Sequence, residues 1–146
     1  MESRSLQVSW IVLTVALVPA MLSGILLAVA PTVFIAGEFA AFTGGSLGEF
    51  AEAQPAAYAF LLLEDSELGV FLFGLLLLTL LITVIPYRKG ERWAWYAVLA
   101  SLILSAIGSV GLNIPTGDLG VVILTGSIHL VGLVGLAIGA RPHLRK

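Results

Sequence analysis

Cysteine is absent from this chain of 146 residues, and charged residues are scarce. Without a thiol, the chain can form no disulfide, no thiolate metal site and no cysteine nucleophile. Charged residues make up 11% of the sequence and apolar residues 59%, whereas a typical soluble domain has roughly 25% and 45–50%. This composition excludes an ordinary soluble domain and indicates a protein of the membrane.

Residues 5–87 and 93–140 contain no lysine or arginine. Within these two stretches lie four runs that carry no charge at all. The uncharged runs are residues 5–37, 68–87, 93–117 and 119–140. A helix needs about 20 residues to cross a hydrocarbon core, so each run is long enough to span a membrane. The expected spans are about residues 7–30, 68–85, 93–112 and 119–140. The predicted fold class is all-α, a polytopic four-helix membrane bundle formed as one domain by residues 1–146.

The segment between the first two predicted spans, residues 32–67, is acidic and aromatic and contains no lysine or arginine. Its apolar content is too high for a simple solvated loop, so we expect a partly helical cap. Ser46 and Glu49 match a helix-capping box, in which the serine hydroxyl accepts a hydrogen bond from the Glu49 amide. Pro55 marks a second helix start, because proline suits the first helical turn.

The basic residues all fall in segments that four spans place on one side of the membrane. These residues are Arg4, Arg88, Lys89, Arg92, Arg141, Arg145 and Lys146. Seven of the nine acidic residues fall on the other side. By the positive-inside rule, the pattern predicts a multi-pass protein of the cell (plasma) membrane with both termini in the cytoplasm. Tyr87, Trp93, Trp95 and Tyr96 would then form the inner aromatic belt.

Small residues indicate which helix faces pack closely. Lipid is as apolar as leucine, so membrane helices associate through close contacts and polar bonds. Ser101, Ser105 and Gly108 share a face of the third span, and Gly135 and Gly139 share a face of the fourth. We expect both stripes to contact neighbouring helices. One neighbour of the fourth span could be a second protomer, so homo-oligomerisation stays open.

His129 lies about ten residues inside the fourth span, or roughly 15 Å from its outer end. Ionisable side chains at this depth are costly and commonly functional. His129 could relay protons, bond a quinone or lipid headgroup, or ligate haem; the alternative is a neutral ring that bonds a serine or a carbonyl. Haem normally takes a second axial ligand, and the other histidine, His143, falls in the predicted cytoplasmic tail. Haem is therefore disfavoured; we expect no cofactor and leave quinone open.

Acidic residues gather at the outer end of the predicted bundle, Glu64, Glu67 and Asp118 among them. Asp118 precedes His129 by eleven residues, close to three helical turns, so the two would share a face if the helix extends that far. The acids could form a half-channel for protons or a polar headgroup, hold a divalent cation weakly, or only keep the outer surface hydrated. We take these four residues and Thr125 as candidate ligand-binding residues and assign no metal site.

Residues 86–96, which read PYRKGERWAWY, form a basic turn between aromatic residues. This stretch resembles the inner turn of DoxX-like and related families of small prokaryotic four-helix membrane proteins, most of which have no assigned activity. The resemblance implies a four-helix membrane fold and, as in some DoxX members, a place in a quinone-linked membrane oxidoreductase. It carries over no site residue, because the outer cap matches no functional motif.

The sequence contains no phosphate loop, HExxH motif, dinucleotide fingerprint or catalytic triad, and nothing in it indicates nucleic-acid binding. A non-enzymatic function is therefore favoured. The leading hypothesis is a small integral membrane protein that binds a lipid-like ligand or a partner subunit in its outer half. The alternatives are an accessory quinone-linked subunit of a redox complex and a small proton-linked transporter that acts as an oligomer.

Overall fold

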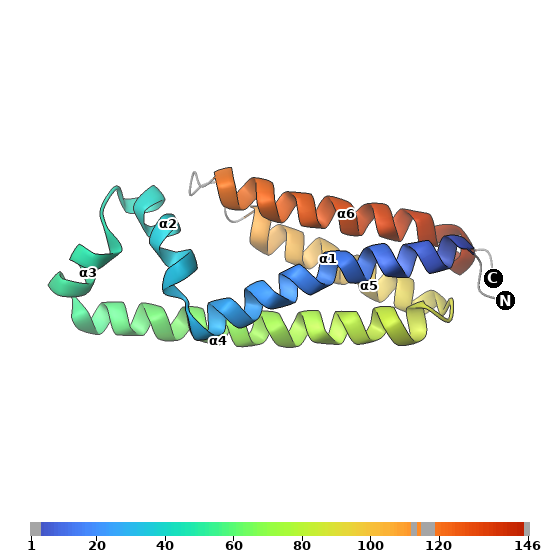
Figure 1. Cartoon of the computed structure of the whole chain (residues 1–146), viewed down its shortest axis with the longest axis horizontal. Coiled ribbons are helices and arrows are strands. Elements are labelled where there is room, and N and C mark those ends of the chain that lie inside the picture. Colours follow the sequence, from blue (N-terminus) through green and yellow to red (C-terminus); the bar gives the residue numbers. More distant parts are fainter. Residues whose placement is uncertain (1–3, 112–113, 115–118, 145–146) are drawn as a thin grey trace.

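Four long apolar helices pack together in the computed structural model, which describes residues 4–111, 114 and 119–144 (Figure 1). They are α1 (Arg4–Val29), α4 (Pro55–Ile82), α5 (Arg92–Ala106) and α6 (Leu119–Leu144). Two π-helical turns, η1 (Thr83–Tyr87) and η2 (Ile107–Gly111), extend α4 and α5. The predicted all-α fold with four apolar spans is confirmed.

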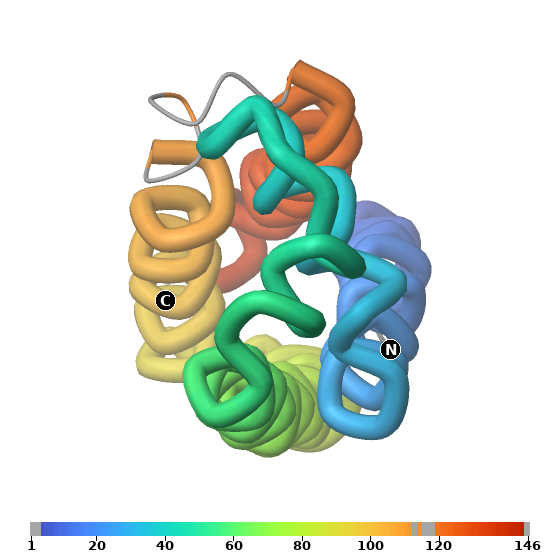
Figure 2. Tube along the Cα trace, turned by 90° about the vertical axis from the view of Figure 1, so that its left-hand side faces the viewer, coloured from blue at the N-terminus to red at the C-terminus, as the bar shows by residue number. Residues whose placement is uncertain are grey.

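Seen along the bundle, the four helices surround a common axis, and α1 lies between α4 and α6 (Figure 2). The largest buried cluster lies in the half of the bundle that holds both chain ends (Figure 1). Its members are Leu6, Leu13, Tyr87, Ala94, Val98, Leu102 and Leu136. This buried cluster is therefore far from the segment that joins α1 to α4.

The second span starts much earlier than the sequence predicts, because α4 begins at Pro55 and continues without a break. Proline occupies the first helical turn there, where its missing N–H would have had no partner. Together α4 and η1 comprise 33 residues, roughly 50 Å of helix, whereas a hydrocarbon core is about 30 Å thick. Residues 55–67, which we call the α4 extension, are thus continuous with the span and reach past the other long helices (Figure 1).

Two short helices, α2 (Thr32–Thr43) and α3 (Leu47–Ala53), cover this end of the bundle (Figure 2). Gly44 ends α2 in the left-handed conformation at φ 73°. Ser46 caps α3 as predicted, since its Oγ accepts from the Glu49 amide at 3.1 Å. The rings of Phe39 and Phe50, 5.0 Å apart, join the two helices. The partly helical cap is therefore present, but it comprises α2 and α3 and ends before Pro55.

The basic turn between α4 and α5 begins where proline interrupts the helical hydrogen bonds. Pro86 has no N–H for the Ile82 carbonyl, and the helix widens into η1. The Arg88 amide then donates to the Thr83 carbonyl at 3.2 Å. Gly90, at φ 77°, supplies the left-handed residue that reverses the chain.

The aromatic belt predicted around this turn is only half present. Trp93 and Tyr96 are exposed, as belt residues would be. Tyr87 has no exposed surface, and Trp95 donates its Nε1–H to the Leu136 carbonyl at 3.0 Å. The prediction is wrong for Tyr87 and Trp95, because both side chains bond other helices of the bundle.

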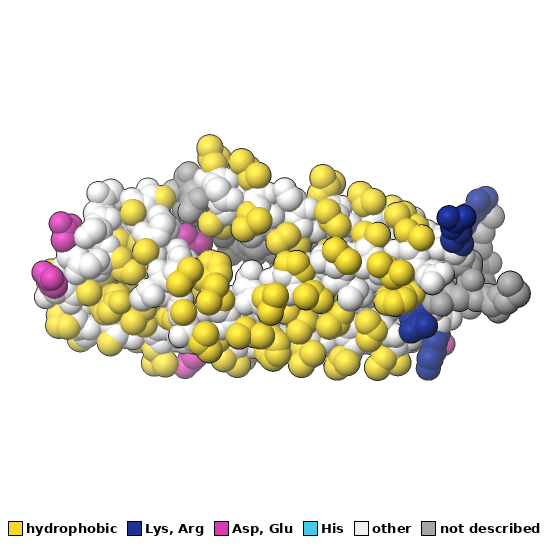
Figure 3. Space-filling view, viewed as in Figure 1, with side chains coloured by type: hydrophobic (Ala, Val, Ile, Leu, Met, Phe, Trp, Pro, Cys, Tyr) yellow, Lys and Arg dark blue, Asp and Glu magenta, His cyan; other side chains and the backbone are white. Residues whose placement is uncertain are grey.

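Charge divides the molecule along its long axis (Figure 3). Lysine and arginine side chains gather at the end with the two termini, which we call the basic end. Aspartate and glutamate gather mainly at the opposite end, which we call the acidic end. Between the two ends, the surface facing the viewer is apolar over a long band. Such a band is what lipid requires, so the chain is a multi-pass membrane protein.

Candidate functional site

His129 of α6 is held by hydrogen bonds at both ring nitrogens. Its Nδ1 lies 2.7 Å from the carbonyl oxygen of Thr125, and its Nε2 lies 2.8 Å from Oγ of Ser105 on α5. A carbonyl can only accept, so Nδ1 carries a proton; the Ser105 hydroxyl, which also lies 3.2 Å from the Leu102 carbonyl, is the partner of Nε2. Both nitrogens of the half-buried ring therefore have a hydrogen-bond partner within the bundle.

The serine stripe of α5 joins two different neighbours. Ser105 bonds His129 on α6, while one turn away Ser101 Oγ lies 2.9 Å from Thr79 Oγ on α4. Thr125 donates its hydroxyl back to the Val121 carbonyl at 2.7 Å, which leaves its own carbonyl for His129. These bonds tie α4, α5 and α6 together near the middle of the bundle.

The glycine stripe of α6 packs against α1 within the same chain. A Cβ at Gly135 would lie 3.0 Å from Val12 Cγ1, and one at Gly139 would overlap the side chains of Ser9 and Tyr87. This face is therefore already filled and offers no contact to a second protomer. Gly108, in η2, is exposed, and a Cβ there would meet nothing within 4 Å.

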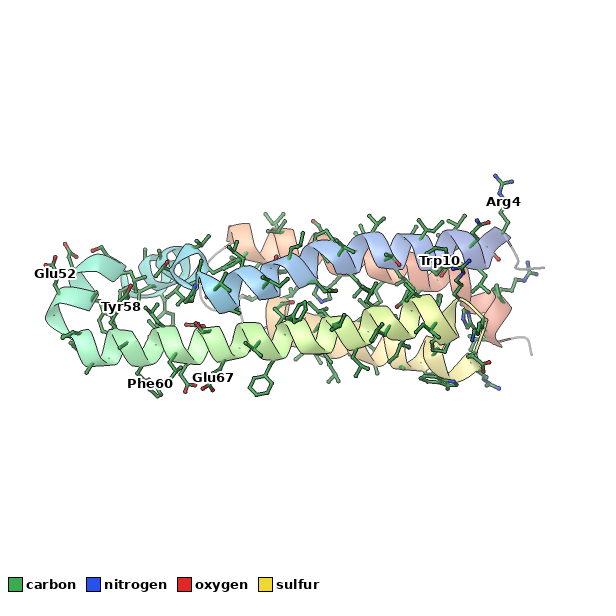
Figure 4. The ribbon with its side chains drawn as sticks, turned by 60° about the horizontal axis from the view of Figure 1, so that its bottom comes forward. Arg4, Trp10, Glu52, Tyr58, Phe60 and Glu67 are labelled. Atoms are coloured by element: carbon green, nitrogen blue, oxygen red, sulfur yellow. The ribbon has the colours of Figure 1, made fainter. Side chains whose placement is uncertain are left out.

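Two of the predicted acidic residues, Glu64 and Glu67, lie on α4 and not beside His129. Glu64 and Glu67 are exposed on the α4 extension, and Glu67 points away from the other helices (Figure 4). Asp118 lies outside the described residues, and its alignment with His129 stays a prediction. Among the residues that the structure describes, no group of three histidine, aspartate or glutamate side chains could hold a metal ion.

A groove of about 510 Å³ runs between α5, η2 and α6 beside His129. Its lining comprises Ile103, Ala106, Ile107, Val110, Gly111, Gly126, His129, Leu130 and Leu133. All of these are apolar or glycine except His129. The groove opens outward, since Ile107 is 58% and Leu130 63% exposed. It is therefore a lipid-facing site with one polar ring in its wall.

A second polar cluster lies at the basic end. Ser9 Oγ is 2.6 Å from the Tyr87 hydroxyl and donates to the Gly135 carbonyl at 2.7 Å. His143 has no exposed surface, and its ring centroid lies 4.2 Å from that of Tyr87. The cluster joins α1, η1 and α6 by side chains that the sequence does not distinguish from lipid-facing or solvated ones.

The segment that follows the fourth predicted span is helical, because α6 continues through Pro142 to Leu144. His143 thus belongs to the bundle. It follows His129 by 14 residues on one helix, roughly 21 Å along the axis. The two imidazoles cannot ligate the same haem iron across that distance.

No family model matches this chain, and neither does any curated protein or solved structure. The resemblance of residues 86–96 to DoxX-like proteins therefore gains no support from these comparisons. The four long apolar helices of the described residues nevertheless identify the molecule as a small multi-pass membrane protein.

Proposed function

We propose that this protein holds the hydrocarbon chain of a lipid-like ligand in the groove between α5 and α6. The groove itself carries the proposal: it is an open apolar depression of about 510 Å³ on the lipid-facing surface, with His129 as its polar lining residue. Its apolar walls suit a chain that arrives from the surrounding lipid. Dispersion contacts along those walls would hold the chain.

Two features set the width of the groove: a glycine in its wall and a hydrogen bond between α5 and α6. A Cβ at Gly126 would meet nothing within 4 Å, so this position lines the groove with backbone alone. The bond from Ser105 to His129 fixes the separation of α5 and α6 beside it. Both nitrogens of His129 already have partners, so its ring would line the groove without bonding the ligand. The shape of the groove is then the main determinant of binding.

A hydrocarbon chain fits this groove better than a partner helix does. Membrane helices associate through small residues that let two backbones approach, or through polar bonds. Here Ile103, Ile107 and Leu130 are all exposed at the groove and would keep a helix backbone at a distance. A slender chain can pass between these side chains. Retained ligand, and not a second subunit, is thus the expected occupant.

Filling the groove should abolish ligand retention. We expect Gly126→Leu to remove most of the lipid or quinone that co-purifies with the protein, because a leucine side chain would occupy the space of the chain. Native mass spectrometry of protein released from gently solubilised membranes measures the retained mass. That mass also separates phospholipid from quinone.

The matched control is Gly74→Leu on α4. Gly74 is exposed, a Cβ there also meets nothing within 4 Å, and it does not line the groove. Retention should be unchanged in this variant. A wild-type protein without any bound mass, or equal retention in both variants, would contradict the proposal.

We also propose that the basic end faces the cytoplasm. The support is the gathering of arginine and lysine at one end of the apolar band, as the positive-inside rule requires (Figure 3). The absence of cysteine allows single cysteines to report the topology. In intact cells, a membrane-impermeant maleimide should label Glu52→Cys of α3 and should label Lys89→Cys only after permeabilisation. The reverse pattern would invert the orientation.

A further inference from the structure

The groove between α5 and α6 lies in one half of the membrane span. Ile103, the lining residue of α5 nearest the basic end, follows the exposed Trp93 by ten residues, or roughly 15 Å. On α6, Leu133 precedes Arg141 by eight residues, or roughly 12 Å. Exposed tryptophan and arginine mark the membrane interface, and half of a hydrocarbon core is about 15 Å thick. The groove therefore begins near the middle of the membrane and runs from there toward the acidic end.

The lining of the groove changes along its length. Two glycines lie toward its acidic end, Gly111 of η2 and Gly126 of α6, and a Cβ at either position would meet nothing within 4 Å. Toward the middle of the membrane the lining residues are Ile103 and Leu133, which carry branched side chains. The groove is thus least obstructed at its acidic end. A hydrocarbon chain that enters there belongs to a lipid of the acidic-end leaflet, the half of the bilayer on that side.

The charge at this end of the molecule has one sign (Figure 3). The cap and the α4 extension together carry the carboxylates of Glu38, Glu49, Glu52, Glu64, Asp65 and Glu67. Residues 5–87 and 93–140 contain no lysine or arginine, so the sequence offers neither to an anionic headgroup at this end. The summed field of several like charges extends over the protein surface. It repels an anionic headgroup and tolerates an uncharged or zwitterionic one.

We propose that the groove takes its ligand from the acidic-end leaflet and selects an amphiphile whose headgroup carries no net negative charge. This inference rests on the proposed function and specifies its ligand. The hydrocarbon chain fills the groove, and the uncharged or zwitterionic headgroup lies at the end that holds the carboxylates. The basic end has the opposite preference, because Arg88, Lys89 and Arg92 are exposed there and attract anionic headgroups. The protein therefore contacts different lipids in the two leaflets.

Nanodiscs that contain equal amounts of phosphatidylcholine and phosphatidylglycerol with identical acyl chains test the headgroup. Native mass spectrometry of the released protein measures how much of each lipid stays bound to wild type, Gly126→Leu and the control Gly74→Leu. Lipid that is lost in Gly126→Leu and kept in Gly74→Leu is groove lipid, and we expect it to be phosphatidylcholine. Groove lipid that is half or more phosphatidylglycerol would overturn this inference and leave the proposed function standing. Equal retention of both lipids in all three proteins would contradict both.

A variant of the basic end separates the two leaflets in the same nanodiscs. Lys89→Gln combined with Arg92→Gln should lower the retained phosphatidylglycerol and leave the retained phosphatidylcholine unchanged, because both residues lie at the opposite end from the mouth of the groove. Loss of phosphatidylcholine in this variant would overturn the assignment to the acidic-end leaflet. If Gly126→Leu does not fold, Gly111→Leu fills the groove from the other wall and provides the same comparison.

Discussion

Replacing Gly69 by alanine is expected to destabilise the bundle, whereas the same change at Gly74 should stabilise it slightly. A Cβ at Gly69 would lie 2.8 Å from Cα of Ala28 and overlap its backbone nitrogen. Backbone atoms cannot rotate away, so α1 and α4 must separate. We expect a loss of about 1–3 kcal/mol in the free energy of unfolding, as overpacking of a tight contact produces.

Gly74 is the control for this change on the same helix. It is exposed, and a Cβ there meets nothing within 4 Å, so only the helix propensity changes. Alanine should then add up to about 1 kcal/mol. Denaturant unfolding in detergent micelles measures both variants. Similar effects of the two substitutions would show that the close approach of α1 and α4 contributes little.

Ser9→Ala is expected to cost more stability than Tyr87→Phe, although both remove the same hydrogen bond. Ser9 donates to the Gly135 carbonyl, so the Tyr87 hydroxyl must be the donor to Ser9. Alanine at residue 9 leaves a fully buried tyrosine hydroxyl without its acceptor, at a cost of about 1–3 kcal/mol. Phenylalanine at residue 87 leaves Ser9 bonded to Gly135 and should cost about 0.5–1.5 kcal/mol.

A double-mutant cycle tests this order of donors and acceptors, in which Tyr87 donates to Ser9 and Ser9 donates to Gly135. In the Ser9→Ala background the tyrosine hydroxyl has lost its acceptor, and Tyr87→Phe removes this unpaired group. The double variant should therefore be more stable than the sum of the two single losses in unfolding free energy predicts. The free energy of unfolding of the three variants and wild type gives the coupling. Strict additivity, or a larger loss of stability for Tyr87→Phe than for Ser9→Ala, would contradict the hydrogen-bond order from Tyr87 to Ser9 to Gly135.

Local rules of the sequence predicted much of this fold. An uncharged run of about 20 residues has few structural solutions other than a membrane helix, so all four spans could be recognised. The Ser46 cap and the helix start at Pro55 follow from groups within a few residues of each other. Predictions of this kind depend on the chain nearby and not on its partners.

Contacts between helices could not be predicted in the same way. The chain has 16 glycines, and the sequence does not say which of them meet a backbone. Gly69 touches α1, whereas Gly108 and Gly126 face open space. The difference depends on where two helices cross, which is set by all of their side chains together.

The contacts of His143, a polar residue, could not be predicted from the sequence either. Arg141 and Pro142 before it are typical of a helix end, and they predict a solvated tail. The helix continues to Leu144, and the imidazole lies 3.0 Å from the carbonyl oxygen of Tyr87, a residue of η1 more than fifty residues earlier. A site assembled from such distant segments leaves no local pattern.

The continuous course of α4 and η1 connects the two ends of the molecule. The close backbone contact with α1 at Gly69 lies 14 residues from Pro55 and 18 residues from Tyr87, or roughly 21 and 27 Å along the helix. The first of these segments packs against α3 of the cap, and the second ends at the Tyr87 carbonyl, 3.0 Å from His143. The cap at the acidic end and the buried cluster at the basic end are therefore parts of one continuous length of helix.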